Sequence, residues 1–240
     1  MAKSQFQTFN HLKIHSQYSI CEGAIKIDDL KEFSKANKVR ALGLCDTSNL
    51  CGALEFAEKI SKSGTQPIIG TQINFRYGDT TGLLPLYALD EDGYKKIIEL
   101  SSLSYLNNDE LSDAHLDIKE LLVESNGVAL FSGTVNGLFG KLFDKGKTKD
   151  IFELYNKFKS IYQNNFYIEI QRHGDQNEEG FEKFNLDKSY ELKIPLIATN
   201  EVFYLSNDMH EAHDALICIK NKTYINEKNR IRFSDQHYLK

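Results

Sequence analysis

The chain has 240 residues, of which 41% are hydrophobic, and its formal net charge at pH 7 is −5. This composition allows one large buried core, and the slightly acidic balance gives no overall field that would attract a phosphate backbone, although a local basic patch is compatible with it. Four scattered cysteines without a Cys-x-x-Cys pair, no signal peptide and no run near the about 20 apolar residues of a membrane span predict a soluble cytoplasmic protein with reduced thiols.

Strand patterns begin near the N-terminus and recur along the whole chain. The segment His11–Ser19 reads as a strand that ends in a turn, and its alternation places His11, Lys13 and His15 on one face. Six further apolar runs are typical of buried strands. They are Ala41–Cys45, Pro67–Gly70, Leu83–Leu89, Val128–Ser132, Phe166–Ile170 and Pro195–Thr199.

Helical patterns fill the intervals between these runs. Asp28 or Asp29 is expected to cap a first helix. A second helix is expected from about Ser48, with Leu54 on its apolar face and Gly64 as its stop. Three more helices are expected at 94–101, 151–162 and 212–217, and the apolar spacing within 151–162 is strongly amphipathic.

The alternation of strands and helices with short connections predicts the fold class. It indicates an α/β fold in which helices cover a parallel sheet, best satisfied by a closed β/α barrel, with a doubly wound open sheet as the alternative. We expect one barrel domain over residues 5–220. Residues 221–240 turn polar and charged, and we expect them to begin a connection to a following region, so that the chain is cut from something longer.

The histidine patterns argue against a simple metal site. His11 and His15 flank Lys13, and two imidazoles at the mouth of a barrel strand would form a metal clamp, but the ammonium of Lys13 repels a divalent ion. His210 and His213 are three residues apart and miss the four-residue spacing of the helical zinc motif. The first pattern predicts a clamp that has been lost, and the second predicts ordinary packing.

Several sequence blocks follow one another in the order known from one family. The blocks are His11–Ser19, Gly43–Gly52, Pro67–Gly70, Glu91–Tyr94, Ile168–Gly174, Pro195–Val202 and Ala212–Leu216. Together they resemble the N-terminal PHP (polymerase and histidinol phosphatase) domain of bacterial DNA polymerase III alpha subunits, over nearly the whole chain. The resemblance implies a distorted seven-stranded β/α barrel, with metal ligands in active members at the carboxyl ends of the strands.

The same resemblance assigns the positions of the family's metal site, and most of them no longer hold a ligand. They are Lys13, His15, Glu22, Thr47, Gln72, Leu83, Thr134, Glu201 and Phe203. Only His15, Glu22 and Glu201 keep ligand character, whereas a multinuclear site needs several imidazoles and carboxylates around each ion. We therefore expect no metal and no catalytic residue in this segment, and we expect Lys13 to form an ion pair near Glu22 and Glu201.

The resemblance also implies a role within a larger enzyme. The barrel would be an inactive structural platform of a replicative DNA polymerase, with no cofactor of its own. The polymerase residues and their magnesium ions would lie beyond Lys240. The implied partners are the rest of the alpha subunit, the proofreading exonuclease subunit and, through the full-length enzyme, DNA, with no membrane partner.

Two other functions remain as alternatives. One is a PHP-type metal-dependent phosphoesterase or 3′–5′ exonuclease with a drifted ligand set, and the other is a binding module without a polymerase. The drifted set would comprise His15, Glu22, Asp46, Glu169, His173 and Glu201. Otherwise Glu169 and His173 are expected to order a strand end and the loop after it. The lysines at 141, 145, 147 and 149 are expected on a solvated face rather than at a nucleic acid.

Overall fold

The computed structural model describes residues 9–108, 113–123 and 126–240, so residues 5–8 of the expected barrel domain lie outside the described residues. The strands are β1 (Lys13–Ile14), β2 (Ala41–Thr47), β3 (Gln66–Tyr77), β4 (Thr80–Ala88), β5 (Leu116–Asp117), β6 (Val128–Phe131), β7 (Phe166–Ile170), β8 (Leu196–Ala198) and β9 (Glu201–Val202). The α-helices are α1 (Ile27–Asn37), α2 (Ala53–Lys62), α3 (Glu91–Leu106), α4 (Leu138–Asp144), α5 (Thr148–Tyr162), α6 (Glu178–Leu192) and α7 (His210–Asn221). Short 3-10 helices are η1 (Ile118–Leu121), η2 (Gln163–Asn165) and η3 (Asn207–Met209).

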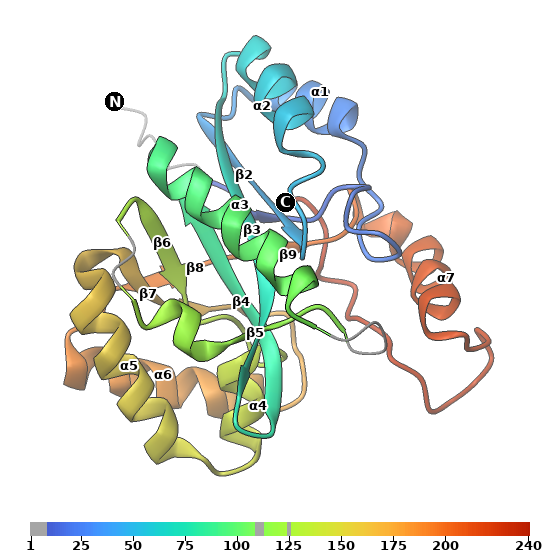
Figure 1. Ribbon diagram of the computed structural model, residues 1–240. Coiled ribbons are helices and arrows are strands. Elements are labelled where there is room, and N and C mark those ends of the chain that lie inside the picture. The colour runs from blue at the N-terminus through green and yellow to red at the C-terminus, as the bar shows by residue number, and fades with distance from the viewer. Residues whose placement is uncertain (1–8, 109–112, 124–125) are drawn as a thin grey trace, which may run out of the picture.

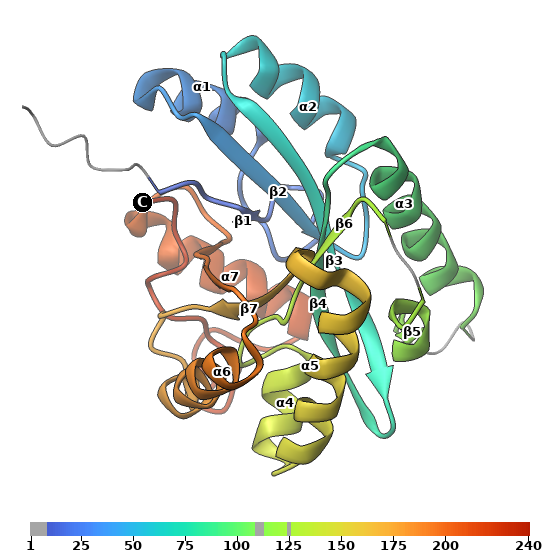
Figure 2. The same cartoon turned by 90° about the vertical axis from the view of Figure 1, so that its left-hand side faces the viewer.

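One curled sheet organises the described part of the chain. Its strand order is β8-β7-β6-β4-β3-β2-β1-β9, with β5 beside β3. Figures 1 and 2 show the sheet bent into a half-barrel with helices around its outer side. The predicted α/β class is confirmed, although the described residues form nine strands where the resemblance implies seven.

The expectation of an all-parallel sheet is wrong at β4, which runs antiparallel to both β3 and β6. Tyr77 of β3 pairs with Thr80 of β4, so only Gly78 and Asp79 connect the two strands. Two residues suffice for a hairpin, whereas a parallel connection needs a crossover of about a dozen residues or more. Gly78 has a φ of +59°, in the left-handed region that tight hairpin turns use.

The two ends of the sheet are linked by one kinked segment rather than by a continuous ladder. β8 pairs with β7 and β9 pairs with β1, and only Thr199 and Asn200 separate β8 from β9. No ladder joins β8 to β9 within the described residues, so the predicted closed barrel is corrected to a half-barrel. Its curl places β1, β3, β4 and β9 around a common interior pocket.

The first helix differs from its prediction at its N-terminus. α1 begins at Ile27, and the residue that precedes it is Lys26, whose side chain makes no capping hydrogen bond. Asp28 and Asp29 lie inside the first turn, where their negative charge interacts favourably with the helix dipole. The expectation that one of these aspartates caps the helix is therefore wrong.

The second helix begins five residues later than expected. Ser48 has a φ of +57°, which a right-handed helix cannot contain, and α2 starts at Ala53. Leu54 is 72% exposed, and Phe56 and Ile60 are buried in its place. The remaining predicted helices are confirmed as α3, α5 and α7. No helix in the described ranges has both the length and the hydrophobicity required to cross a lipid bilayer.

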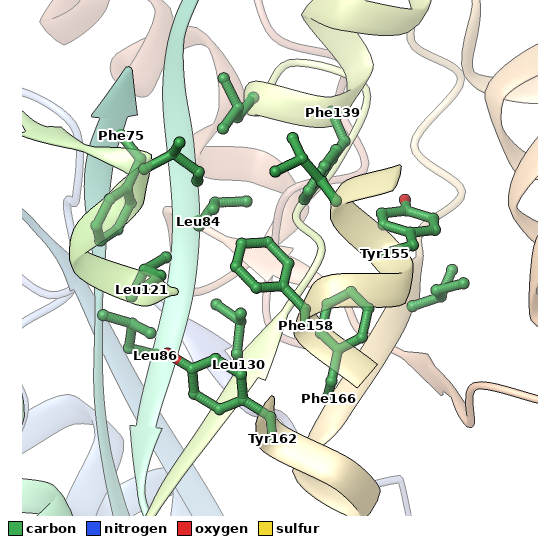
Figure 3. Close-up of a cluster of buried hydrophobic side chains, with 14 of the residues drawn as sticks. Phe75, Leu84, Leu86, Leu121, Leu130, Phe139, Tyr155, Phe158, Tyr162 and Phe166 are labelled. Atoms are coloured by element: carbon green, nitrogen blue, oxygen red, sulfur yellow. The ribbon is translucent and has the colours of Figure 1, made fainter. Parts of the chain in front are cut away.

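Three clusters of buried hydrophobic residues fix the strands in place within the described part of the chain. Figure 3 shows the largest core, in which aromatic side chains from α4, α5 and β7 pack against the inner strands. The rings of Phe158 and Phe166 lie 5.5 Å apart, and those of Phe139 and Tyr155 lie 4.8 Å apart. The second core joins Ile14 of β1 to apolar residues of β2, α1 and α2. Strands β1, β3 and β4 each contribute buried side chains to one of these clusters, which holds them in place.

The final residues of the chain pack against the barrel. Tyr238 forms an isolated bridge with Tyr204, and Leu239 belongs to the second core. His237 is also buried. Residues 237–239 thus contribute to the barrel, while the expected role of 221–240 as the start of a connection stays a prediction.

Candidate functional site

A pocket of about 110 Å³ lies inside the curl of the sheet. It is lined by Lys13, Glu22, Gln72, Leu83, Thr134, Asn136, Gly137, Glu201, Phe203 and Phe233. Seven of the nine positions that the resemblance assigned to a metal site are among these residues. The other two lie beside them, because His15 bonds to Glu201 and Thr47 bonds to Glu22. The fold therefore brings all nine positions together.

Lys13 occupies the centre of this arrangement with its ammonium group. The side chain is 2% exposed, and its Nζ lies 3.3 Å from Oε1 of Glu201 and 3.6 Å from Oε1 of Glu169. Burial alone lowers the pKa of Lys13, but the two carboxylates outweigh this effect and hold it above the usual value of 10.5. The same charge, with the hydrogen bond from His15, overcomes the effect of burial and holds the pKa of Glu201 well below its usual range. The pocket thus contains a charged ion pair at neutral pH.

Glu169 comes from β7 and is the second acceptor for Lys13. Its Oε1 also accepts hydrogen bonds from the hydroxyl of Thr199 and from Nε2 of Gln171. Its Oε2 is buried and has no hydrogen-bond partner among the described residues. Burial of a carboxylate is tolerated here because Lys13 supplies the opposite charge.

Glu22 does not pair with Lys13, so that part of the expectation is wrong. Its carboxylate forms an ion pair with Lys220 of α7 and accepts a hydrogen bond of 2.6 Å from Oγ1 of Thr47. Gln72 donates to the same hydroxyl at 3.0 Å. Glu22 therefore joins the rim of the pocket to α7, and the predicted pair of Lys13 with Glu201 is the one that forms.

His15 is enclosed by partners on both ring nitrogens. Its Nε2 lies 3.1 Å from Oε1 of Glu201, and its Nδ1 lies 3.3 Å from the hydroxyl of Ser19. The ring stacks on Phe203 at 4.5 Å. A metal ligand must present a free nitrogen to the ion, and both nitrogens of His15 are already engaged.

Asp46 acts on the turn that follows β1 instead of facing the pocket. One carboxylate oxygen accepts from the backbone N–H of Ser16 at 2.7 Å and from the hydroxyl of Ser19 at 2.7 Å. The other oxygen accepts from the hydroxyl of Ser16 at 2.8 Å. The strand β2 thereby fixes the loop that carries Glu22 toward the pocket.

Phe203 makes one wall of the pocket apolar. Its ring stacks on His15 and on His213 and contacts Phe233 at 4.9 Å. Leu83 of β4 adds a second apolar side chain to the lining. Neither side chain has an atom that can bind a metal ion.

The residues present do not fit a divalent metal. An ammonium lies beside two buried carboxylates, Glu169 and Glu201, and it occupies a position where the ions of a multinuclear site would require a ligand. Among the described residues, no group of three or more His, Cys, Asp or Glu side chains is arranged to hold an ion. We derive no chemical step through a metal at this site.

The other polar residues considered from the sequence have separate roles. His173 stacks on His237 with ring centres 4.0 Å apart and bonds to Asn200, and no hydrogen bond or ion pair joins it to Glu169. His210 and His213 both bond to backbone carbonyls. These placements agree with packing roles for the two helix histidines.

The lysine cluster before and within α5 is tied to the β3–β4 turn. Asp79 at the tip of this hairpin contacts Lys145 and Lys147 at 3.5 and 2.6 Å. Lys141 donates to the carbonyl of Thr81. Part of the positive charge of this cluster is therefore neutralised within the chain.

His237 was not singled out from the sequence, and it should make stability depend on pH. Burial lowers the pKa of His237 from 6.5 to about 3, so the unfolded chain binds a proton before the folded chain does. Its contribution is complete above pH 6.5 and is lost as the pH falls toward 3. Between about pH 7 and pH 5, the free energy of unfolding should fall by about 2 kcal/mol more in the unaltered chain than in His237→Gln. Urea denaturation at each pH measures this.

The matched control for this prediction is His115→Gln, because His115 lies outside the core and its ring nitrogen Nδ1 contacts the carbonyl of Asp113 at an exposed position. The control should keep the pH dependence of the unaltered chain. An unchanged pH dependence in His237→Gln would show that His237 titrates normally in the folded protein.

The curled sheet, with its helices outside and its pocket inside, forms an α/β half-barrel. The chain matches the PHP domain over residues 11–173. An amidohydrolase structure from Chromobacterium violaceum, described with bound sulfate and no metal, has a TM-score of 0.54 and 12% identity, covering 81% of this chain and 87% of that one. At this identity the likeness bears on the fold alone. The chain belongs to the PHP domain family.

Within this family the chain is similar to one group of polymerase subunits. The DNA polymerase III subunit alpha of Caulobacter vibrioides is 34% identical over 248 residues, which is 100% of this chain and 22% of the relative. That of Rickettsia conorii is 36% identical over 224 residues, which is 92% of this chain and 19% of the relative. The chain is homologous to the N-terminal part of these subunits and spans about a fifth of their length.

Proposed function

We propose that this chain is the PHP barrel of a replicative DNA polymerase III alpha subunit and serves there as an inactive structural platform. The observation that carries the proposal is the ammonium of Lys13 inside the pocket, paired with Glu201 and Glu169. This cation satisfies carboxylates that would otherwise attract a metal ion. The pocket then contributes to folding and not to phosphoester cleavage.

The wider setting of the proposal extends the homology to the polymerase subunits. DNA synthesis and its magnesium ions are assigned to a region beyond Lys240, and the barrel needs no cofactor. The platform supports the rest of the alpha subunit, docks the proofreading exonuclease subunit, and meets DNA through the full-length enzyme in the cytoplasm. No polymerase or exonuclease catalytic residue is assigned to this segment.

The competing function is a metal-dependent phosphoesterase or 3′–5′ exonuclease that uses a drifted ligand set. His15, Glu22 and Glu201 are the side chains that keep ligand character for it. Its weakness is that Glu22 is paired with Lys220 and that Glu201 is paired with Lys13. Metal binding would have to break both pairs and move the ammonium of Lys13 out of the pocket.

One experiment separates the two functions. Protein purified without chelators is assayed for metals by mass spectrometry and then incubated with manganese, zinc and a 3′-labelled DNA strand. We expect far less than one metal ion per chain and no shortening of the strand. Stoichiometric metal, together with cleavage that His15→Ala abolishes and the control His115→Ala preserves, would overturn the proposal.

A further inference from the structure

One segment of the chain exposes apolar side chains that contribute to no core. We define the arm as residues 219–232, from the end of α7 to the segment that returns to the barrel. Figure 1 shows this loop, in red after α7, extending away from the sheet. Its large apolar side chains are exposed by 58–75%, and they are Ile219, Tyr224, Ile225 and Ile231. Four large exposed apolar side chains within one short segment are typical of a contact surface.

The arm carries a local positive charge, in contrast to the net negative charge of the whole chain. It contains five lysine or arginine residues and one acidic residue, Glu227, which gives a net charge of +4 in a chain of net charge −5. The cationic residues are Lys220, Lys222, Lys228, Arg230 and Arg232. The arm is therefore the kind of basic patch that the overall composition leaves open.

Some of these cations hold the arm in place and others are available to a ligand. Lys220 pairs with Glu22, and Arg230 forms a two-pronged pair with Asp214 of α7. Arg232 lies 3.6 Å from Asp214 and keeps 52% of its side chain exposed. Within the described residues, Lys222 and Lys228 form no ion pair, and both are exposed.

Hydrogen bonds give the arm a defined shape. The backbone N–H of Tyr224 donates to the carboxylate of Glu227 at 2.9 Å, and the N–H of Glu227 donates to the carbonyl of Tyr224 at 3.0 Å. Arg230 donates to the carbonyl of Ile225 at 3.2 Å. The turn is thus closed by its own polar groups while the ring of Tyr224 stays 75% exposed.

We propose that the arm is a binding surface for single-stranded DNA. Lys222 and Lys228 offer unpaired charges to successive phosphates, and Tyr224 offers an exposed face on which a base can stack. A single strand fits better than a duplex, because duplex bases are already stacked on one another. A protein partner fits less well, because lysine is depleted at protein interfaces. This inference goes beyond the platform function, which assigns DNA contact only to the full-length enzyme.

The test is fluorescence anisotropy of a labelled oligothymidylate titrated with the 240-residue chain at several salt concentrations. Binding should weaken with salt, and Lys222→Glu with Lys228→Glu should reduce affinity at least tenfold and flatten the logarithmic salt slope by about 1.4. Tyr224→Ala should weaken binding about tenfold without changing that slope.

The matched control is Lys157→Glu with Lys183→Glu, which makes the same change of charge on exposed positions of α5 and α6. It should retain the affinity of the unaltered chain. Absence of binding at low salt, or equal losses in the two double variants, would overturn the proposal. The proposal would also be overturned if Tyr224→Ala abolished binding to a protein partner and left binding of the oligonucleotide unchanged. The metal measurement does not involve the arm, so failure of either proposal is distinguishable.

Discussion

Replacing Lys13 with methionine should lower the free energy of unfolding by about 3–5 kcal/mol, because removal of one partner leaves a buried charge uncompensated. Methionine fills nearly the same volume, so the loss reports charge and not a cavity. Glu201 and Glu169 would remain buried with their compensating ammonium gone. Urea denaturation followed by circular dichroism measures the change.

Two further variants identify the origin of this loss. In the combined variant Lys13→Met, Glu169→Gln and Glu201→Gln, none of these three positions carries a charge, and most of the lost stability should return. Lys59→Met removes a cation that pairs with Asp28 and Glu55 at the surface, and it should have a much smaller effect. If Lys13→Met were no more damaging than Lys59→Met, the ion pair would not be what fills the pocket.

Replacing Asp46 with alanine should cost about 3–4 kcal/mol of stability. The change leaves three buried donors without an acceptor, namely the N–H and hydroxyl of Ser16 and the hydroxyl of Ser19. Each unpaired buried donor costs about 1–3 kcal/mol. The turn that carries Glu22 should loosen as a result. Thermal and urea denaturation give the loss, and hydrogen exchange of residues 16–23 reports the loosening.

Asp90→Ala is the matched control for Asp46. The carboxylate of Asp90 accepts one hydrogen bond, from the N–H of Gly93 at the start of α3, and its loss should cost about 1 kcal/mol. Faster exchange at 16–23 should appear only in Asp46→Ala. Equal losses in the two variants, with no change at 16–23, would mean that Asp46 does not organise the turn.

The elements predicted best from the sequence are those with strong local signals. Residues 166–170 are predicted with the bounds that β7 has, because a short apolar run lies between polar segments. The strand at Leu83–Leu89 was predicted and corresponds to β4, but its antiparallel direction was missed, although Gly78 and Asp79 between two strands are the signal of a hairpin. The start of α2 was missed because a left-handed residue, Ser48, has no clear sequence mark when it is not glycine.

The ion pairs within the site join residues that are far apart in the sequence, and only some of these pairs could be predicted from the sequence. The charge of Glu169 in the apolar strand β7 indicates a partner of opposite charge in the interior. No feature of the sequence near Glu169 identifies Lys13 as that partner. Glu22 pairs with Lys220, which lies 198 residues away, so local spacing cannot assign it. The family resemblance supplied the set of positions that meet in the pocket, and the structure supplied their pairing.

The most direct test of the central claim is a crystal structure of the chain grown with excess manganese, with diffraction measured where manganese scatters anomalously. We predict no anomalous peak in the pocket and the ammonium of Lys13 beside Oε1 of Glu201, at a distance near the 3.3 Å found here. An ion held by His15, Glu22 and Glu201, with Lys13 turned away, would contradict the account and show that the pocket is a metal-binding site.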